Sequence, residues 1–437
     1  MNFSWIYPSF KIWRRKISLS IVDQALVSGA SFIFNVLLAR WLIPGEYGAF
    51  AVVFSIFLFF SGFHNALVLE PMSVIGSAKY KNNFPNYLGL LVCIQIILIF
   101  ILSLILLLLV IPLSIKGNQI LPALWGLIIS GPFMLLFYFM RRTWYLKMRP
   151  EMAVITSLIY TFFLLSGLTI AKVKGWLSPF SAFIIMGLAS LGTVLLLWDF
   201  SSIRLKAKNI LSANPGIKSV FIEHWGYGKW IVGCAFVYWL IGSAYLPLIG
   251  TFAGLSEAGA FRAIQNLILP VNQILTALGL LFLPWVSAKR VTFGNGYLKN
   301  FSLKITVFMV GLTIAYLLLP IIGGRWLVPL FYGEGRYDSY LWLIPYLGGI
   351  ALLGAATQGF ALSLKAAKYP NTIFFSQAGG AFVTLTLGIV LVRKLGLLGA
   401  AVGNISAALT VLVITIYLWN KVFGYRANLK ALRPNDP

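Results

Sequence analysis

The sequence predicts an all-α polytopic membrane protein, from its composition, the length of its apolar runs and the placement of its charges. Hydrophobic residues make up 60% of the 437-residue chain and charged residues only 10%, whereas about a quarter of a soluble domain is charged. Apolar runs such as LGLLVCIQIILIFILSLILLLLVI (88–111) recur from end to end. Because a helix of roughly 20 apolar residues spans a bilayer, the chain is expected to cross the membrane many times.

Twelve apolar windows are long enough to be spanning helices. The longest connection between them, residues 199–229, separates six windows from six, so we expect two six-helix bundles, residues 1–210 and 211–437. The twelve windows are residues 19–39, 48–69, 88–111, 119–140, 152–171, 178–198, 229–251, 258–284, 303–322, 340–362, 371–391 and 397–419.

The basic residues alternate between the two sides of the membrane. Of the 34 Lys and Arg residues, 25 fall on the side of the N-terminus and 9 on the other side. Cytoplasmic segments carry the excess of Lys and Arg in membrane proteins. The asymmetry therefore predicts a multi-pass protein of the cytoplasmic (inner) membrane with both termini in the cytoplasm. It also explains the net charge of +24 without nucleic acid, for which the chain carries no motif.

A short phrase is repeated at an offset of 211 residues, as EYGAF (46–50) and EAGAF (257–261). Six windows separate the copies, so the two halves have the same orientation and form a parallel repeat, a pattern that transporters use around a central substrate site. Each phrase stands where a helix is expected to begin. The positive end of the helix dipole at that point favours a negatively charged glutamate. We expect Glu46 and Glu257 to mark helix starts rather than to take part in transport.

Polar residues line one face of the first window and one side of the eighth. Such faces in membrane helices contact protein or water rather than lipid. Hydrogen bonds between helices account for single serines, but six polar residues along the eighth window favour a hydrated central cavity lined by windows 1, 2, 7 and 8. The predicted cavity residues are Gln24, Ser28, Ser31, Asn35, Lys229, Arg262, Gln265, Asn266, Asn272 and Gln273.

Arg262 is the sharpest candidate, because a charge inside a bilayer is costly unless it is paired or hydrated. Its guanidinium suits two oxygens of a phosphate. The alternatives are that it extends to the outer headgroups or pairs with Glu257. Lys229 is expected at the inner mouth of window 7, where it would attract an anionic headgroup.

Three ionisable residues, Asp23, His64 and Glu70, stand towards the cytoplasmic ends of windows 1 and 2. Buried carboxylates and histidines titrate near neutral pH, so these residues are candidates for coupling transport to protons or sodium. The alternative is that Asp23 and Glu70 stay solvated at the membrane edge and that His64 bonds a neighbouring helix.

Motifs for enzymes and cofactors do not occur in the sequence. There is no phosphate-binding G-x-x-x-x-G-K-[ST] loop, no His/Cys metal cluster and no G-x-S-x-G elbow. Cys93 and Cys234 both lie in apolar runs, so no disulfide is expected. We expect neither a cofactor nor a metal, and no enzymatic activity.

Several segments resemble bacterial polysaccharide-type flippases of the MOP (multidrug/oligosaccharidyl-lipid/polysaccharide) superfamily. SFIFNVLLARWLIPGEYGAFAV (31–52) resembles the first helix pair, VPLFYGEGRYDSYLWLIPYLGG (328–349) the connection of spans 9 and 10, and RKLGLLGAAVGNISAAL (393–409) the start of span 12. The resemblance implies a MATE-like fold around a central cavity. It also implies transport of a polyprenyl-diphosphate-linked oligosaccharide for O-antigen, lipopolysaccharide, capsule or exopolysaccharide assembly. The implied partners are membrane lipid, a polysaccharide polymerase and a chain-length regulator.

Two other functions remain open. A multidrug exporter of the same superfamily would favour an acidic or aromatic cavity for cationic compounds. An integral-membrane enzyme of polysaccharide assembly, such as a polymerase, would need catalytic groups in an outer loop, and Arg325, Glu334, Arg336 and Asp338 form the only such cluster.

Overall fold

The computed structural model describes residues 6–76, 79–80, 83–115, 119–198 and 216–423. Every regular element within these ranges is an α-, 3-10 or π-helix, and none is a strand. Lipid offers no hydrogen-bond partners to the backbone, so a chain of this composition satisfies its N–H and C=O groups inside helices. The prediction of an all-α membrane protein is confirmed.

The chain forms two compact units, Met1–Phe236 and Val237–Pro437. The expected division between residues 210 and 211 lies in 199–215, outside the described residues. Helix α8 (Ile217–Gly242) contributes its first 20 residues to unit 1 and its last six to unit 2. A helix that opens the second half of the sequence is therefore held largely by the first unit.

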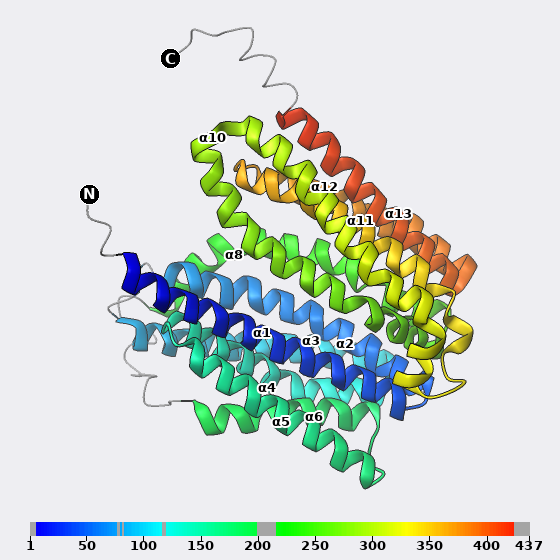
Figure 1. The fold of residues 1–437 in the computed structure, drawn as a ribbon. Coiled ribbons are helices and arrows are strands. Elements are labelled where there is room, and N and C mark those ends of the chain that lie inside the picture. The colour runs from blue at the N-terminus through cyan, green and yellow to red at the C-terminus, as the bar shows by residue number, and fades with distance from the viewer. Residues whose placement is uncertain (1–5, 77–78, 81–82, 116–118, 199–215, 424–437) are drawn as a thin grey trace. The chain divides into compact units, whose positions relative to one another are not determined.

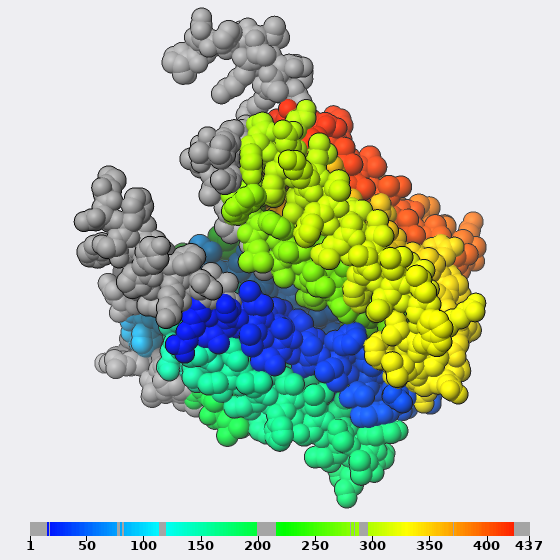
Figure 2. Space-filling model, viewed as in Figure 1, coloured from blue at the N-terminus to red at the C-terminus, as the bar shows by residue number. Residues whose placement is uncertain are grey.

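Unit 1 is a helical bundle in which α4 packs against α6, α2 and α3, while α1 lies along α5 (Figures 1 and 2). Proline at the first or second position begins α2, α4, α5 and α6, where its missing N–H costs no hydrogen bond. The elements are α1 (Ile6–Trp41), α2 (Pro44–His64), the π-helices η2 (Asn65–Leu69) and η3 (Met72–Gly76), α3 (Phe84–Ile115), α4 (Leu121–Leu146), α5 (Pro150–Val173) and α6 (Pro179–Leu197).

Unit 2 is dominated by α10, which doubles back on itself and packs against α11 (Figure 1). Its two arms, Leu255–Ser287 and Gly296–Tyr332, are each long enough to span a bilayer. The elements are α9 (Tyr245–Phe252), α10 (Leu255–Tyr332), the 3-10 turn η6 (Asp338–Tyr340), α11 (Leu343–Ala366), α12 (Pro370–Val383), the π-helix η7 (Thr384–Gly388) and α13 (Ile389–Phe423).

The spanning segments of the described residues match the expected number. Ten continuous helical segments are long and apolar enough to cross a membrane, and the pair α8–α9, bent by 47°, makes eleven. The longest of them, Asn371–Phe423, is broken at Gly396, whose φ of 58° and ψ of −128° are not helical. Glycine adopts this positive φ without a Cβ clash, so the break separates two of the twelve expected spans.

Several segments extend beyond their expected windows, among them α1, which begins at Ile6 rather than 19. Helix α4 runs to Leu146 rather than 140, and the second span continues through two π-helical segments to Gly76 rather than 69. Helix α8 begins at Ile217 rather than 229, because buried residues recur every fourth position, at Val220, His224 and Gly228. Lys229 therefore lies in the middle of α8 rather than in its first turn.

Both copies of the repeated phrase begin helices, as predicted. Glu46 stands in the first turn of α2 and Glu257 in the first turn of α10. The phenylalanine that ends each phrase, Phe50 or Phe261, is fully buried in its own unit. The phrase is thus a helix start that anchors an aromatic side chain in the bundle, which is reason enough for its repetition.

The predicted orientation can be checked with two exposed positions, Ser219 at the start of α8 and Lys174 after α5. In a background with Cys93→Ala and Cys234→Ala, we expect Lys174→Cys to react with an impermeant thiol reagent applied to intact cells. Ser219→Cys should react only after the membrane is permeabilised. The reverse pattern of labelling would contradict cytoplasmic termini.

Candidate functional site

A buried carboxylate joins three helices of unit 1. Asp23 of α1 is fully buried, and Arg141 of α4 donates to both of its oxygens, with Nη2 2.6 Å from Oδ2 and Nε 3.2 Å from Oδ1. The hydroxyls of Tyr145 and Ser157 also donate to this carboxylate. Asp23 is therefore bound on both oxygens by a cation and two hydroxyls. The alternative prediction that Asp23 stays solvated at the membrane edge is therefore wrong.

A second polar group follows on α4. Nη2 of Arg142 lies 3.3 Å from the side-chain oxygen of Asn65, the first residue of η2, and Asn65 in turn lies 3.5 Å from Glu70. All three side chains are partly buried. This second group contains one cation, one anion and an amide between them, which leaves it near neutrality inside the unit.

His64, the last residue of α2, is fully buried, as is Gln95 of α3. The two side chains lie close enough to interact. Neither ring nitrogen of His64 nor either amide atom of Gln95 makes a hydrogen bond with another described residue. Buried polar atoms without partners are rare in folded proteins, so His64 remains a candidate.

The π-helical segment after His64 is bonded to α8. The ring of His224 lies 2.9 Å through Nδ1 from the carbonyl oxygen of Leu67 and 2.8 Å through Nε2 from the hydroxyl of Tyr87. A carbonyl only accepts, so Nδ1 carries the proton and Nε2 accepts from Tyr87. Gly228 lies against the same segment, where a Cβ would come within 2.5 Å of the carbonyl oxygen of Ala66.

The connection between η3 and α3 adds an ion pair to this contact. Glu223 of α8 accepts from Lys79 at 2.5 Å and from the hydroxyl of Tyr80 at 3.1 Å. The hydrogen bond that Lys79 donates to Glu223 raises the pKa of Lys79, and partial burial raises the pKa of Tyr80. Tyr80 also stacks on Tyr87, with ring centroids 4.4 Å apart. The first part of α8 is thus bound to the connection before α3 through Glu223, which accepts from Lys79 and Tyr80.

The polar face predicted for α1 is internally hydrogen-bonded. Gln24 donates to Ser28 at 3.2 Å and accepts from Arg141 at 3.3 Å, while Asn35 donates to the carbonyl oxygen of Ser31 at 2.8 Å. Gln24 is exposed, whereas Asn35 is buried. The end of this face near Gln24 is therefore open, and its opposite end is enclosed.

The polar side of α10 lies in unit 2. Arg262 is partly buried and donates to the side-chain oxygen of Gln265 at 2.9 Å, and Asn266 beside it is fully buried. Two turns further along, Asn272 and Gln273 are exposed. Glu257, the alternative partner considered for Arg262, accepts from the hydroxyl of Tyr340 at 2.9 Å.

Tyr340 belongs to the connection between α10 and α11. Burial, followed by the hydrogen bond to Glu257, raises its pKa to about 12. Asp338 in the same connection accepts from the backbone N–H of Gly335 at 2.9 Å and closes a turn. Asp338 therefore closes a turn of this connection, and Tyr340 attaches the connection to the first turn of α10.

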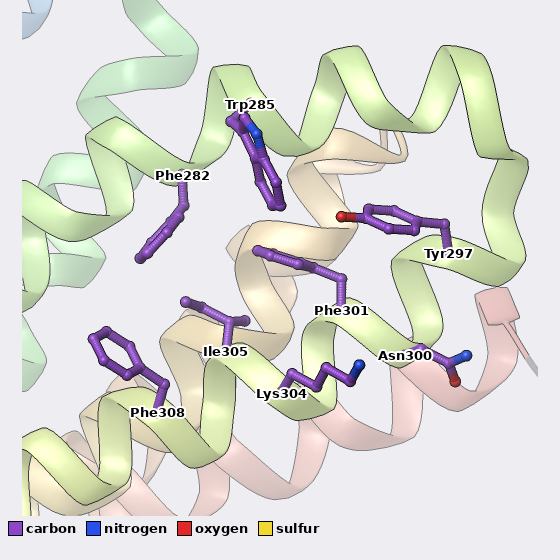
Figure 3. A pocket seen from close by; sticks show the side chains of 8 residues that line it. All are labelled: Phe282, Trp285, Tyr297, Asn300, Phe301, Lys304, Ile305 and Phe308. Atoms are coloured by element: carbon purple, nitrogen blue, oxygen red, sulfur yellow. The ribbon is translucent and has the colours of Figure 1, made fainter.

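The two arms of α10 enclose an aromatic cavity of about 450 Å³. The rings of Trp285, Tyr297 and Phe301 line one side of the cavity, and the centroids of the Trp285 and Phe301 rings lie 5.4 Å apart. Phe282 and Phe308 line the other side (Figure 3). Lys304 is the charged residue of this lining. Its rings are suited to flat apolar groups, the aromatic surround expected of a site for organic cations, and Lys304 adds one positive charge to it.

Lys229 of α8 is exposed and lies over the ring of Trp230, 5.7 Å from its centroid. The described residues hold no group of three or more His, Cys, Asp or Glu side chains that could bind a metal ion. Cys93 and Cys234 are both free thiols. These positions assign no metal or disulfide chemistry to the described part of the chain.

Comparison with solved structures identifies the fold. A MATE-family multidrug resistance transporter of the MOP superfamily, in an inward-facing conformation, aligns with a TM-score of 0.73 at 11% identity, over 96% of this chain and 100% of its own. The lipid II flippase MurJ aligns with a TM-score of 0.66 at 16% identity, over 92% of this chain and 87% of its own. The chain has the fold of MOP-superfamily transporters.

A third similar structure is a ligand complex of the MATE multidrug transporter DinF-BH, with a TM-score of 0.63 and 12% identity over 94% of this chain and 95% of its own. No protein-family model matches the sequence, and no curated protein matches it. Both drug transporters and a lipid flippase thus share this MOP-type fold, and the chain is a multi-pass membrane protein of that architecture.

Several residues of these clusters escaped the sequence analysis. Arg141 and Arg142 counted only as loop charges, although they lie within α4. Gln95, His224 and Glu223 belong to apolar runs or to the expected connection before residue 229. The available signal was a basic pair directly after an apolar window, together with an aspartate in another window, which indicates that the membrane helix is longer than its apolar part.

The ion pair between Asp23 and Arg141 gives a stability prediction. Asp23→Asn would leave the guanidinium of Arg141, whose side chain is 15% exposed, without its anionic partner. Breaking a buried pair from one side costs about 3–5 kcal/mol. We expect a lower thermal midpoint and less folded protein in detergent, as measured by fluorescence-detected size exclusion after heating.

The double variant Asp23→Asn/Arg141→Gln is the matched control, because it removes both charges. It should recover part of the loss, since no isolated charge remains buried. An unchanged midpoint for Asp23→Asn alone would show that the carboxylate is already protonated or hydrated in the protein, contrary to the contacts described above.

Proposed function

We propose that this chain is a flippase, which translocates a polyprenyl-diphosphate-linked oligosaccharide across the cytoplasmic membrane by alternating access. The oligosaccharide would be the repeat unit of an O-antigen, capsule or exopolysaccharide. The observation that carries the proposal is the polar side of α10, where a partly buried arginine stands with Gln265 and Asn266 inside a spanning helix. The MOP-type fold, which a lipid II flippase shares, supports it.

The physical task is to shelter a charged, hydrated headgroup while its hydrocarbon tail stays in the bilayer. Exposed polar side chains inside the spans, at Gln24, Asn272 and Gln273, are disfavoured against lipid and are suited to a hydrated cavity. In the proposal they line that cavity together with Ser28, Ser31, Asn35 and Lys229, and Arg262 binds the diphosphate. A polysaccharide polymerase and a chain-length regulator are the proposed partners, and no cofactor is needed.

The charge of the spans favours an anionic substrate. The carboxylate of Asp23 is neutralised by Arg141, and that of Glu70 stands in one group with Arg142. A site for organic cations would need an accessible carboxylate or an uncharged aromatic surround. The described lining of the aromatic cavity in α10 contains Lys304 and no acidic residue, which makes it a poorer match for a cationic drug.

The role of Arg262 gives the main test. Its guanidinium can offer two parallel donors to phosphate oxygens, lysine offers a point charge and alanine offers none. Losing a hydrogen bond to a charged group costs about 1.5–3 kcal/mol, or roughly ten- to hundredfold in affinity. We expect transport of a fluorescent lipid-linked oligosaccharide in proteoliposomes to fall in the order wild type, Arg262→Lys, Arg262→Ala.

Arg325→Ala is the matched control, because Arg325 is an exposed cation on the same helix α10. It should transport as wild type does, and so should Glu257→Gln, whose partner is Tyr340. Equal transport by wild type, Arg262→Lys and Arg262→Ala would contradict the proposed diphosphate site at Arg262. Gradient-driven export of a lipophilic cation by vesicles that do not flip the oligosaccharide would establish the multidrug alternative, which the shared fold supports equally.

We further propose that the group around Glu70 and His64 couples transport to a proton or sodium gradient. The Asp23 carboxylate is engaged by four donor atoms of Arg141, Tyr145 and Ser157, which suits a fixed structural role better than cyclic protonation. Glu70 has a longer, weaker contact of 3.5 Å with Asn65, and His64 has buried ring nitrogens without partners among the described residues. These two residues are the better coupling candidates.

The coupling proposal predicts that the wild type and Glu70→Gln, a neutral replacement of similar shape, respond differently to an ion gradient. Glu70→Gln should transport down a substrate gradient but lose most of its response to an imposed pH or sodium gradient. Glu151→Gln, which removes an exposed carboxylate in the first turn of α5, is the matched control and should keep that response. Undiminished gradient dependence in Glu70→Gln vesicles would exclude Glu70 from coupling.

A further inference from the structure

The first arm of α10 is fastened along one side by hydrogen bonds to its backbone. The hydroxyl of Tyr332 donates to the carbonyl oxygen of Ala263, and that of Tyr316 donates to the carbonyl oxygen of Leu267, each at 2.8 Å. Both tyrosines belong to the second arm of α10. Tyr332 is fully buried, and its ring meets that of Tyr337 edge-on with centroids 5.4 Å apart. The two carbonyls are four residues apart and therefore lie one above the other on the same side of the helix.

A further bond continues this row. The side-chain amide of Gln358 in α11 donates to the carbonyl oxygen of Leu275 at 2.8 Å, and Leu275 follows Leu267 by eight residues, on the same broad face. A Cβ on Gly279, one turn further along, would come within 2.4 Å of the amide nitrogen of Gln358. The first arm thus approaches α11 closely and is bonded to it through its backbone.

The side chains proposed to meet the substrate project from a different side of the same arm. Arg262 precedes Ala263 by one residue, and a step of one residue turns a helix by about 100°. Gln265, Asn266 and Gln273 follow Arg262 by three, four and eleven residues and so share its side. The backbone bonds therefore fix the rotation of the arm about its axis, and that rotation sets the direction of its polar side.

Pro270 lies close beyond the segment that the tyrosines bond. Proline has no N–H, so Pro270 cannot donate to the carbonyl oxygen of Asn266, and its ring crowds the preceding turn. The intrahelical ladder is therefore weakened within the polar part of the arm. The bonds to Ala263 and Leu267 hold the turn before this gap in the ladder, and so compensate for it from the second arm.

We infer that Tyr316 and Tyr332 are positioning residues of the substrate site, whose hydroxyls set the rotation of the first arm and so direct the guanidinium of Arg262 towards the diphosphate. The inference rests on the proposed function, which assigns the diphosphate to Arg262. Neither tyrosine touches the substrate in this scheme. Phenylalanine at either position keeps the ring and removes only the O–H, so the contribution of each bond can be measured alone.

Binding of two prenyl compounds to the purified full chain in detergent, followed by isothermal titration calorimetry, tests the inference. Farnesyl diphosphate carries the group that Arg262 is proposed to bind, and farnesol is the matched compound without it. We expect Tyr332→Phe and Tyr316→Phe each to weaken binding of farnesyl diphosphate about fivefold, the loss expected for one neutral hydrogen bond, and to leave farnesol binding unchanged. Tyr417→Phe is the matched control, because Tyr417 is 64% exposed on α13, and it should bind both compounds as wild type does.

The same variants on an Arg262→Ala background separate positioning from stability. If the tyrosines act through Arg262, Tyr332→Phe should have no further effect on that background, because the group that it positions is gone. An equal loss on both backgrounds or an equal loss for farnesol would show that the hydroxyls only satisfy buried groups, and would overturn the inference. Unchanged binding of farnesyl diphosphate in both single variants would overturn it as well.

A labelling measurement decides the rotation of the arm even if Arg262 does not bind the diphosphate. Gln273 on the polar side is exposed, and Val271 on the bonded side is fully buried. In a chain without its native cysteines, Gln273→Cys should react with a charged thiol reagent much faster than Val271→Cys. The double phenylalanine variant should lose most of that preference, and an unchanged preference would overturn the inference. Equal binding of farnesyl diphosphate by wild type and Arg262→Ala would contradict the proposed function and leave the rotational role of the tyrosines to this measurement.

Discussion

The absence of hydrogen-bond partners in lipid governs this molecule, because it forces each backbone group in the spans to find its partner within the protein. Helices meet that demand along most of the described chain. The demand is harder to meet where the second span widens into π-helical turns, since these shift the hydrogen-bond ladder. There the imidazole of His224 bonds the carbonyl of Leu67, and this bond brings the first part of α8 onto unit 1.

The same constraint applies to charges, and unit 1 meets it by internal neutralisation. Arg141 binds the buried Asp23, while Arg142 and Glu70 share Asn65. A charge in the spans without such compensation would cost several kcal/mol. The arginines of α4 therefore bind partners inside the bundle, and Arg141 positions α1 and α5 through one carboxylate.

Hydropathy predicted the class and the starts of most helices, because those features depend on local composition. It misplaced α8, since Lys218, Glu223 and Lys229 interrupt the apolar run although Val220, His224 and Gly228 are buried at a spacing of four. Hydropathy did not predict the contacts between helices. Asp23 and Arg141 are 118 positions apart, and no window of a single sequence reveals that such residues meet. The polar face of α1 was visible, but which of its ends is enclosed depends on tertiary packing.

The chemical difference between Arg141 and Arg262 bears on which guanidinium a diphosphate could recruit. Arg141 donates to both oxygens of a carboxylate, a charged acceptor that a phosphate would have to displace. Arg262 donates to Gln265, a neutral acceptor, and hydrogen bonds between a cation and an anion are about twice as strong as those to neutral groups. Exchange of Gln265 for a phosphate oxygen is therefore favourable where exchange of Asp23 is not. A transporter also needs a site whose affinity differs between its conformations, because a ligand shifts a conformational equilibrium only through such a difference. In the proposed function, exchange of the Gln265 contact of Arg262 for a contact with phosphate would supply such a difference on α10.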